Sequence, residues 1–218
     1  MGTVTIAATY GAGGSVIAPA VAERLGLPFV ERAIPVAVAE RIHEPLEEAL
    51  ADDEKDHSTV VGRLLNSVLA SSGLFVGVPQ TPEELGVLPE ISQTEKALRL
   101  MADGGGAVIL GRAGVFVLQG HANVLHVRLD GDVESRRRAA MARQGLDYAT
   151  ATRIQQETDR ARKAYIQHFY PRAGAWEDPR HYHLVIDSTA ISLGVCTDII
   201  VRAAEDLSGK ASQRAGGA

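Results

Sequence analysis

The chain has 218 residues, of which 45% are hydrophobic and 22% charged, and its net charge is −5 at pH 7. This composition is that of an ordinary globular domain, and the acidic balance argues against a general nucleic-acid binder. The single cysteine, Cys196, excludes an intrachain disulfide and a cysteine-based zinc site. The chain shows neither a signal-peptide pattern nor the roughly 20 apolar residues of a membrane span. We therefore expect a cytoplasmic protein without nucleic-acid or membrane partners.

The charges are unevenly distributed along the chain. Residues 44–57 contain seven acidic side chains and one lysine, whereas residues 134–172 contain nine arginines or lysines and four acidic residues. A basic stretch within an acidic protein suits a small, highly charged anion such as a nucleotide.

Strand and helix patterns alternate in chain order. Thr3–Ala8 is an apolar, β-branched run that predicts a strand, and apolar residues at helical spacing from Ile17 to Leu25 predict a helix ended by Gly26. Further strands are expected at Leu27–Val30, Ala107–Leu110, Asn123–Leu129 and His183–Asp187. Further helices are expected at Ala33–Arg41, Pro45–Ala51, Thr59–Leu74, Ser92–Met101, Val133–Gln144, Tyr148–Tyr170 and Ile191–Leu207, with a proline-containing loop at Gly77–Pro89.

This alternation predicts an α/β fold with a mostly parallel five-stranded sheet and helices on both of its faces. Residues 1–207 would form a single domain. Within it, residues 33–104 would be a helical insert over one edge of the sheet. The small, polar residues 208–218 are expected to be a disordered tail. The apolar face of residues 59–74 suits either a core helix or a homodimer interface.

The strongest local motif is a glycine-rich turn between the first strand and the first helix, Tyr10-Gly11-Ala12-Gly13-Gly14-Ser15. Glycines let backbone N–H groups curl around phosphate oxygens, and the following helix adds its N-terminal dipole. On the template G-x-x-x-x-G-K-[S/T], Gly14 occupies the lysine position and Ser15 the position of the magnesium-binding hydroxyl. The motif predicts a P-loop fold, and the alternative is a tight packing turn without a ligand.

The stretch TIAATYGAGGSVIAPAVAERLGLPFVERAI resembles the start of cytidylate kinase-like proteins, P-loop relatives of the nucleoside monophosphate kinases. Further matches follow in the same order: VILGR at 108–112, NVLHVRL at 123–129, ESRRR at 134–138, DRAR at 159–162, YHL at 182–184 and IDST at 186–189. The resemblance covers residues 3–32 and 105–205, whereas residues 44–104 match poorly. That branch commonly lacks the P-loop lysine, as this chain does at Gly14.

The resemblance implies ATP and Mg²⁺ as cofactors. The ATP phosphates would lie on the loop residues Tyr10, Gly11, Ala12, Gly13, Gly14, Ser15 and Val16, with Ser15 also binding the metal ion. Arg138 and Asp187 would lie near the nucleotide. At Asp187 the alternative is a capped helix start formed with Ser188 or Thr189.

The same resemblance places an acceptor site and a lid. Arg112 would bind the acceptor's phosphate, Glu31 and Arg32 would lie on the acceptor side, and Asp159 would approach the acceptor ribose. For Arg112 a salt bridge at a helix end is an equally simple interpretation. In the lid, residues 145–180, the side chains of Arg160, Arg162 and Lys163 would supply the positive charge that Gly14 does not. The alternative is solvent-facing charges paired along a helix.

These patterns favour ATP-dependent phosphoryl transfer to a small acceptor, first of all a nucleoside monophosphate such as CMP. Ser15 and the lid arginines favour this enzyme. Gly14, and Ala113 where orthodox cytidylate kinases have an acidic residue, favour a non-catalytic nucleotide-binding sensor. A kinase for a non-nucleotide acceptor is a third interpretation, because residues 44–104 match the family least.

Overall fold

The computed structural model describes residues 2–31, 88–111 and 113–216. The helices expected at 33–41, 45–51 and 59–74, and nearly all of the loop at 77–89, lie outside the described residues. The insert and lid assignments of the domain layout remain predictions.

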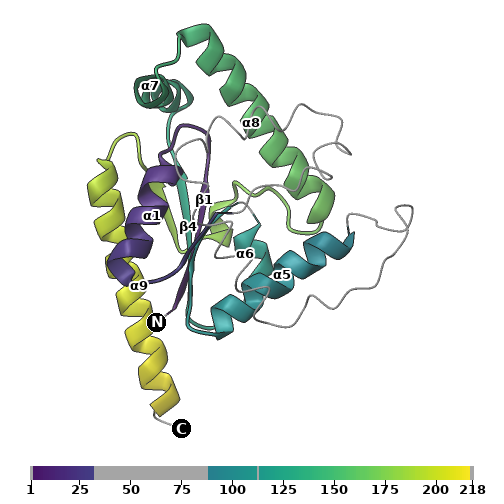
Figure 1. Ribbon diagram of the computed structural model, residues 1–218, viewed down its shortest axis with the longest axis vertical. Coiled ribbons are helices and arrows are strands. Elements are labelled where there is room, and N and C mark those ends of the chain that lie inside the picture. The colour runs from purple at the N-terminus through teal and green to yellow at the C-terminus, as the bar shows by residue number, and fades with distance from the viewer. Residues whose placement is uncertain (1, 32–87, 112, 217–218) are drawn as a thin grey trace.

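The fold is built on one sheet of five parallel strands in the order β2-β3-β1-β4-β5 (Figure 1). The bounds are β1 Thr3–Ala8, β2 Phe29–Glu31, β3 Val108–Leu110, β4 Val124–Asp130 and β5 Leu184–Asp187. The central strand β1 pairs with β4 along its whole length, from Thr3 opposite Val124 to Ala8 opposite Leu129. The predicted five-stranded α/β sheet is confirmed, and within the described residues it is wholly parallel.

Helices cover both faces of this sheet (Figure 1). Helices α1 (Gly14–Leu25) and α9 (Leu193–Gly216) pack on one face, around buried residues such as Ile17 and Ile200. Helices α5 (Leu88–Asp103), α6 (Gly114–Val117) and α8 (Tyr148–Phe169) lie on the other, with Trp176 in the same core cluster. Strands buried on both sides are continuous apolar runs, which is why Ala107–Leu110 was recognisable in the sequence.

The ends of several elements differ from the sequence prediction. Helix α5 begins at Leu88, so Ser92, the expected first residue, lies inside the helix. Helix α9 continues to Gly216, so the predicted disorder from residue 208 is corrected. Residues 208–216 include good helix formers, and an ion pair between Lys210 and Asp206 at 2.6 Å supports this turn. The short helices α6 and η1 (Pro179–His181) were not predicted.

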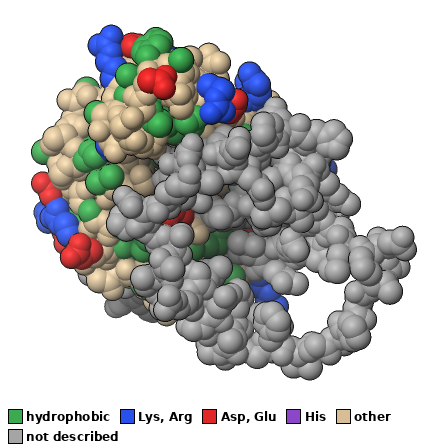
Figure 2. Space-filling model, turned by 45° about the horizontal axis from the view of Figure 1, so that its top comes forward, with side chains coloured by type: hydrophobic (Ala, Val, Ile, Leu, Met, Phe, Trp, Pro, Cys, Tyr) green, Lys and Arg blue, Asp and Glu red, His purple; other side chains and the backbone are tan. Residues whose placement is uncertain are grey.

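Helix α7 (Val133–Gln144) lies beyond the carboxyl ends of the strands and leads into α8 (Figure 1). Asp132 caps α7 and Asp147 caps α8, each carboxylate accepting a backbone N–H at 2.9 Å. None of the described helices is both long and apolar enough to span a membrane. On the face seen in Figure 2, acidic and basic side chains of the described residues are interspersed rather than gathered into one basic surface.

Candidate nucleotide-binding site

The candidate site lies where the parallel strands end. The glycine-rich loop joins β1 to α1, Glu31 ends β2, and Asp130 and Asp187 end β4 and β5. Because the strands are parallel, these residues meet at one edge of the sheet, where open α/β folds bind their ligands.

Two glycines allow the loop its path. Gly11 has a φ of 81°, and a Cβ atom there would lie 2.2 Å from the carbonyl oxygen of Arg136. Gly13 has a φ of 76° and forms the N-cap of α1. Both positions require the left-handed region that glycine enters without strain, so the loop is held to this shape by its backbone.

Side chains from other elements hold the carbonyl groups of the loop. Arg162 Nη1 donates to the Ala8 carbonyl at 2.7 Å, and Arg136 Nη1 donates to the Tyr10 carbonyl at 2.8 Å. Arg143 Nη2 donates to the Gly11 carbonyl at 2.5 Å, and Ser188 Oγ donates to the Ala12 carbonyl at 2.7 Å. These contacts hold the loop through its carbonyl oxygens and use none of its N–H groups.

The backbone N–H groups at the start of α1 are the hydrogen-bond donors of the loop that remain available to a ligand. Within the described part of the chain, Tyr10 N–H donates to Asp159 and Ala12 N–H to Thr9, whereas Gly13, Gly14 and Ser15 N–H donate no recorded hydrogen bond. Unpaired N–H groups at the N-terminus of a twelve-residue helix, together with the helix dipole, form an anion site. The loop can therefore bind phosphate.

Asp159 and Arg136 clamp the start of the loop between α7 and α8. Asp159 accepts from Tyr10 N–H at 3.0 Å through one oxygen and from Arg136 Nη1 at 2.9 Å through the other. The Arg136 side chain is 6% exposed and that of Asp159 28% exposed, so the pair is largely shielded from water. Both oxygens of Asp159 therefore bind within the protein. The acceptor-ribose role predicted for Asp159 stays a prediction.

At the missing lysine position there is no space for a side chain. A Cβ atom on Gly14 would lie 2.7 Å from the Ala8 Cβ and 3.2 Å from Leu110 Cδ1. Ala8 itself occupies the first glycine position of the template, so its methyl group fills the space where a lysine side chain would begin.

The three candidate lid cations, Arg160, Arg162 and Lys163, point in different directions, because successive residues of a helix are about 100° apart around its axis. Arg162 is buried and contacts the loop through Ala8. Arg160 is exposed and has no recorded partner among the described residues, and Lys163 is exposed on the wall of a cavity described below. Only Arg162 of the three touches the phosphate loop.

Ser15 and Val16 follow the loop in the first turn of α1, Ser15 half-buried and Val16 47% exposed. The described residues contain no cluster of three or more metal-ligating side chains. Mg²⁺ is commonly held by few protein ligands, by water and by the phosphates of its nucleotide. The Ser15 hydroxyl would supply the protein ligand.

The remaining predicted site residues are Arg138, Asp187, Glu31, Arg32 and Arg112. Arg138 has a side chain that is 75% exposed and pairs with Glu134 at 3.1 Å, so it does not contact the loop. Asp187 accepts from Thr189 N–H at 2.9 Å and from Ala190 N–H, and hydrogen bonds with Thr189 lower the pKa of its carboxyl group. Glu31 is half-buried at the end of β2. Arg32 and Arg112 lie outside the described residues.

Sequence reasoning missed three residues that hold the loop: Arg136, Arg143 and Ser188. Arg136 and Arg143 are seven residues apart, which places them on one face of α7, and this spacing was available in the sequence. Ser188 was considered only as a helix cap, but its hydroxyl contacts the Ala12 carbonyl instead.

The parallel sheet with strand order 2-3-1-4-5 and the loop between its central strand and α1 define a P-loop kinase-like fold. A sequence profile of the cytidylate kinase-like family matches residues 3–190. The chain belongs to the cytidylate kinase-like family, as its motifs predicted. No curated protein matches it.

Solved structures of similar fold include an uncharacterized protein from Eubacterium ventriosum ATCC 27560, with a TM-score of 0.63 and 19% identity, covering 94% of this chain and 99% of that one. A gluconokinase from Sinorhizobium meliloti 1021 has a TM-score of 0.47 and 18% identity, covering 100% and 97% of the two chains. A sugar kinase from Janibacter sp. HTCC2649 has a TM-score of 0.47 and 17% identity, covering 96% and 95%.

Proposed function

We propose that this protein transfers the γ-phosphoryl group of ATP, in the presence of Mg²⁺, to a small acceptor, and that a nucleoside monophosphate such as CMP is the first candidate. The observation that carries the proposal is the loop between β1 and α1, whose carbonyls are held by side chains and whose N–H groups at Gly13, Gly14 and Ser15 remain available. Membership of the cytidylate kinase-like family supports the same activity.

Phosphoryl transfer needs positioning and positive charge around the transferred group more than covalent chemistry from the protein. Arg162 is the lid residue best placed to supply that charge, because its guanidinium already lies against the Ala8 carbonyl at the base of the loop. A planar guanidinium can bind two phosphate oxygens at once, which suits an arginine to this role. A bond from an acceptor phosphate oxygen to the γ-phosphorus would form as the bond to ADP breaks, giving ADP and a nucleoside diphosphate.

The test is ADP release from Mg-ATP by the purified protein with CMP, dCMP, UMP, AMP and GMP as separate acceptors. We expect release that depends on one pyrimidine monophosphate. Absence of release with all five, in protein that binds ATP by thermal shift, would reject the nucleoside monophosphate acceptor.

A set of lid variants tests the role of Arg162. Arg162→Ala is expected to lower kcat at least about 100-fold, the range seen when one transition-state donor is removed. Arg160→Ala provides the matched control on the same helix, since Arg160 is exposed and away from the loop, and it should change kcat less than about threefold on the same scale. Equal loss in both variants would contradict the assignment to Arg162.

A nucleotide sensor without turnover is the second candidate, and the geometry at Gly14 favours it. Position 14 lacks space for the lysine that reaches the β- and γ-phosphates in an orthodox P-loop. A protein that binds Mg-ATP but releases no ADP with nucleotide or hydroxyl acceptors would support this alternative.

A further inference from the structure

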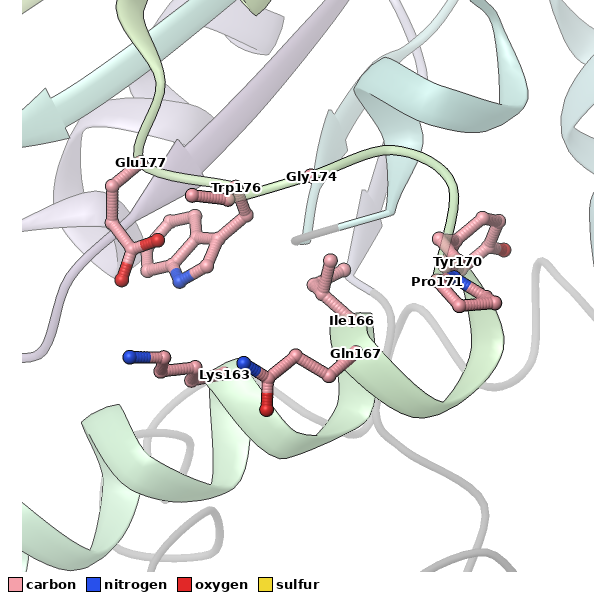
Figure 3. Close-up of a pocket in the computed structure, with 9 residues that line it drawn as sticks. Lys163, Ile166, Gln167, Tyr170, Pro171, Gly174, Trp176 and Glu177 are labelled. Atoms are coloured by element: carbon pink, nitrogen blue, oxygen red, sulfur yellow. The ribbon is translucent and has the colours of Figure 1, made fainter.

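A cavity of about 430 Å³ lies beside the C-terminal half of α8 (Figure 3). Its walls are α8 itself and the segment 170–177 that follows it. The volume is within the range of small-molecule sites, about 300–1,000 Å³. Apolar surface comes from Ile166, Tyr170 and Pro171, and polar groups come from Lys163, Gln167 and Glu177.

One wall of the cavity carries a buried hydrogen-bond donor without a partner. Trp176 is 2% exposed, and its indole N–H is among the buried polar atoms of the described residues that make no hydrogen bond. Figure 3 shows the indole nitrogen directed into the space between Trp176 and the side chains of Lys163 and Gln167. An orphaned buried N–H is uncommon in native proteins and commonly marks a missing water or ligand.

The Trp176 ring is held firmly from behind. The Arg128 guanidinium stacks on it at 5.1 Å from the ring centroid, and Tyr182 donates a hydrogen bond to the Trp176 carbonyl at 2.6 Å. The N–H is therefore fixed in its direction, as a binding site requires.

Charged groups of both signs face the same space. Lys163 and Glu177 line the cavity from opposite walls, and neither side chain has an ion pair or hydrogen bond recorded within the described part of the chain. Lys163 and the indole N–H offer donors to an anionic oxygen, whereas the Glu177 carboxylate accepts from hydroxyl or amino groups.

We infer that this cavity is a ligand site, separate from the phosphate loop, for a small hydroxylated or aminated anion. The carboxylate or phosphate oxygen of the ligand binds Trp176 N–H and Lys163, and its hydroxyl or amino groups bind Glu177 and Gln167. The cavity would bind this ligand whether or not the loop transfers phosphate.

Both walls of the cavity are connected to the phosphate loop. On one side, Arg162 holds the Ala8 carbonyl and is followed directly by Lys163. On the other, Arg128 donates to the Glu177 carbonyl at 2.5 Å and to Asp130, and Asp130 accepts from Thr9 at 2.8 Å. A ligand that draws the two walls together would therefore affect both sets of contacts, the one that ends at the Ala8 carbonyl and the one that ends at Thr9.

The experiment uses intrinsic fluorescence, because Trp176 is the single tryptophan of the chain and reports on this cavity alone. The full chain is titrated with glycerol 3-phosphate, with glycerate, and with uncharged glycerol. The phosphate and carboxylate arms distinguish the two anionic groups. We expect a saturable change with at least one charged probe and none with glycerol.

Three variants and one control assign the signal. Lys163→Met should weaken the apparent affinity at least about tenfold, the effect of losing one charge-assisted hydrogen bond, whereas the exposed control Lys210→Met should not. Val16→Asp puts a carboxylate beside the open N–H groups of the phosphate loop, so it should weaken ATP binding and leave the titration unchanged. Trp176→Phe, measured by calorimetry, should also weaken binding.

No saturable change with either charged probe would overturn the inference, and so would a titration that Lys163→Met leaves unchanged or Val16→Asp abolishes. Lys163→Met should still bind ATP by thermal shift. Failure at the cavity is thus distinguishable from failure of ADP release at the loop.

Discussion

Ala8 and Gly14 lie in contact at the two ends of the phosphate loop, with the Ala8 methyl group where a side chain at position 14 would begin. Gly14 itself lies in helix α1 and its φ is not in the left-handed region, so crowding rather than backbone strain excludes a larger residue. The absence of a lysine at position 14 and the presence of alanine at position 8, the first glycine position of the P-loop template, are therefore linked.

This linkage predicts a rescue. Gly14→Lys should lower the midpoint of thermal unfolding by about 3–10 °C, because overpacking a close contact costs about 1–3 kcal/mol. The double variant Ala8→Gly/Gly14→Lys should recover most of that loss, since it removes the methyl group that collides. Val16→Lys, at an exposed position in the same turn, is the control and should unfold close to the wild-type temperature. Equal midpoints for the single and the double variant would contradict the steric account.

Helices α7 and α8 hold the phosphate loop from outside, so their packing and the conformation of the loop depend on each other. The Arg136–Asp159 pair is the point where all three segments meet. A shielded ion pair that also binds backbone groups contributes more than an exposed pair on a helix surface.

Asp159→Asn tests this difference within one helix. The amide keeps an oxygen for Tyr10 N–H but loses the charge that pairs with Arg136, so we expect a loss of about 1–3 kcal/mol in unfolding free energy and weaker ATP binding. Arg153→Ala removes an exposed pair with Glu157 at 2.9 Å on the same helix and should cost less than about 0.5 kcal/mol. Urea denaturation of both variants measures the two values, and equal losses would argue against a clamp.

At this scale the sequence predicted the elements better than their contacts. Apolar runs and glycine stops are local signals, so β1 and α7 were located to the residue, and α1 ends at Leu25 as predicted although it begins three residues earlier. Which arginine of the Arg136–Arg138 run meets the loop depends on how α7 packs, and that contact involves residues more than a hundred positions away. The direction of Lys163 into a cavity depends likewise on the path of segment 170–177, which carries no periodic signal.

In the molecule as a whole, the parallel sheet separates two cores, and its strands carry several buried polar side chains. His126 in β4 is one such group. Its Nδ1 lies 2.7 Å from Thr5 Oγ1 on β1, and its backbone N–H donates to His183 Nδ1 at 2.9 Å. The two imidazole rings stack with centroids 5.2 Å apart. A histidine in this position is neutral in the fold, because a charge there would be buried beside a second histidine.

Global stability should therefore depend on pH through His126. Burial, and secondarily the charge of His183, lower its pKa from 6.5 to about 4. Since the unfolded chain takes up the proton near pH 6.5 and the folded chain does not, this stability is fully present above that pH and is lost as the pH falls toward 4. The unfolding free energy should decrease by about 2 kcal/mol between pH 7 and pH 5.

Urea denaturation at half-unit pH steps checks this prediction, with His126→Asn as the test and the exposed His168→Asn as the control. His126→Asn should have a lower unfolding free energy at pH 7, because it disturbs the Thr5 contact. Between pH 7 and pH 5 its unfolding free energy should fall less than that of the wild type, by the predicted amount. His168→Asn should follow the wild-type slope. If all three curves run parallel, His126 accepts its proton without unfolding the sheet, and the fall in stability at acid pH must come from carboxylates such as Asp187, whose pKa hydrogen bonds with Thr189 lower.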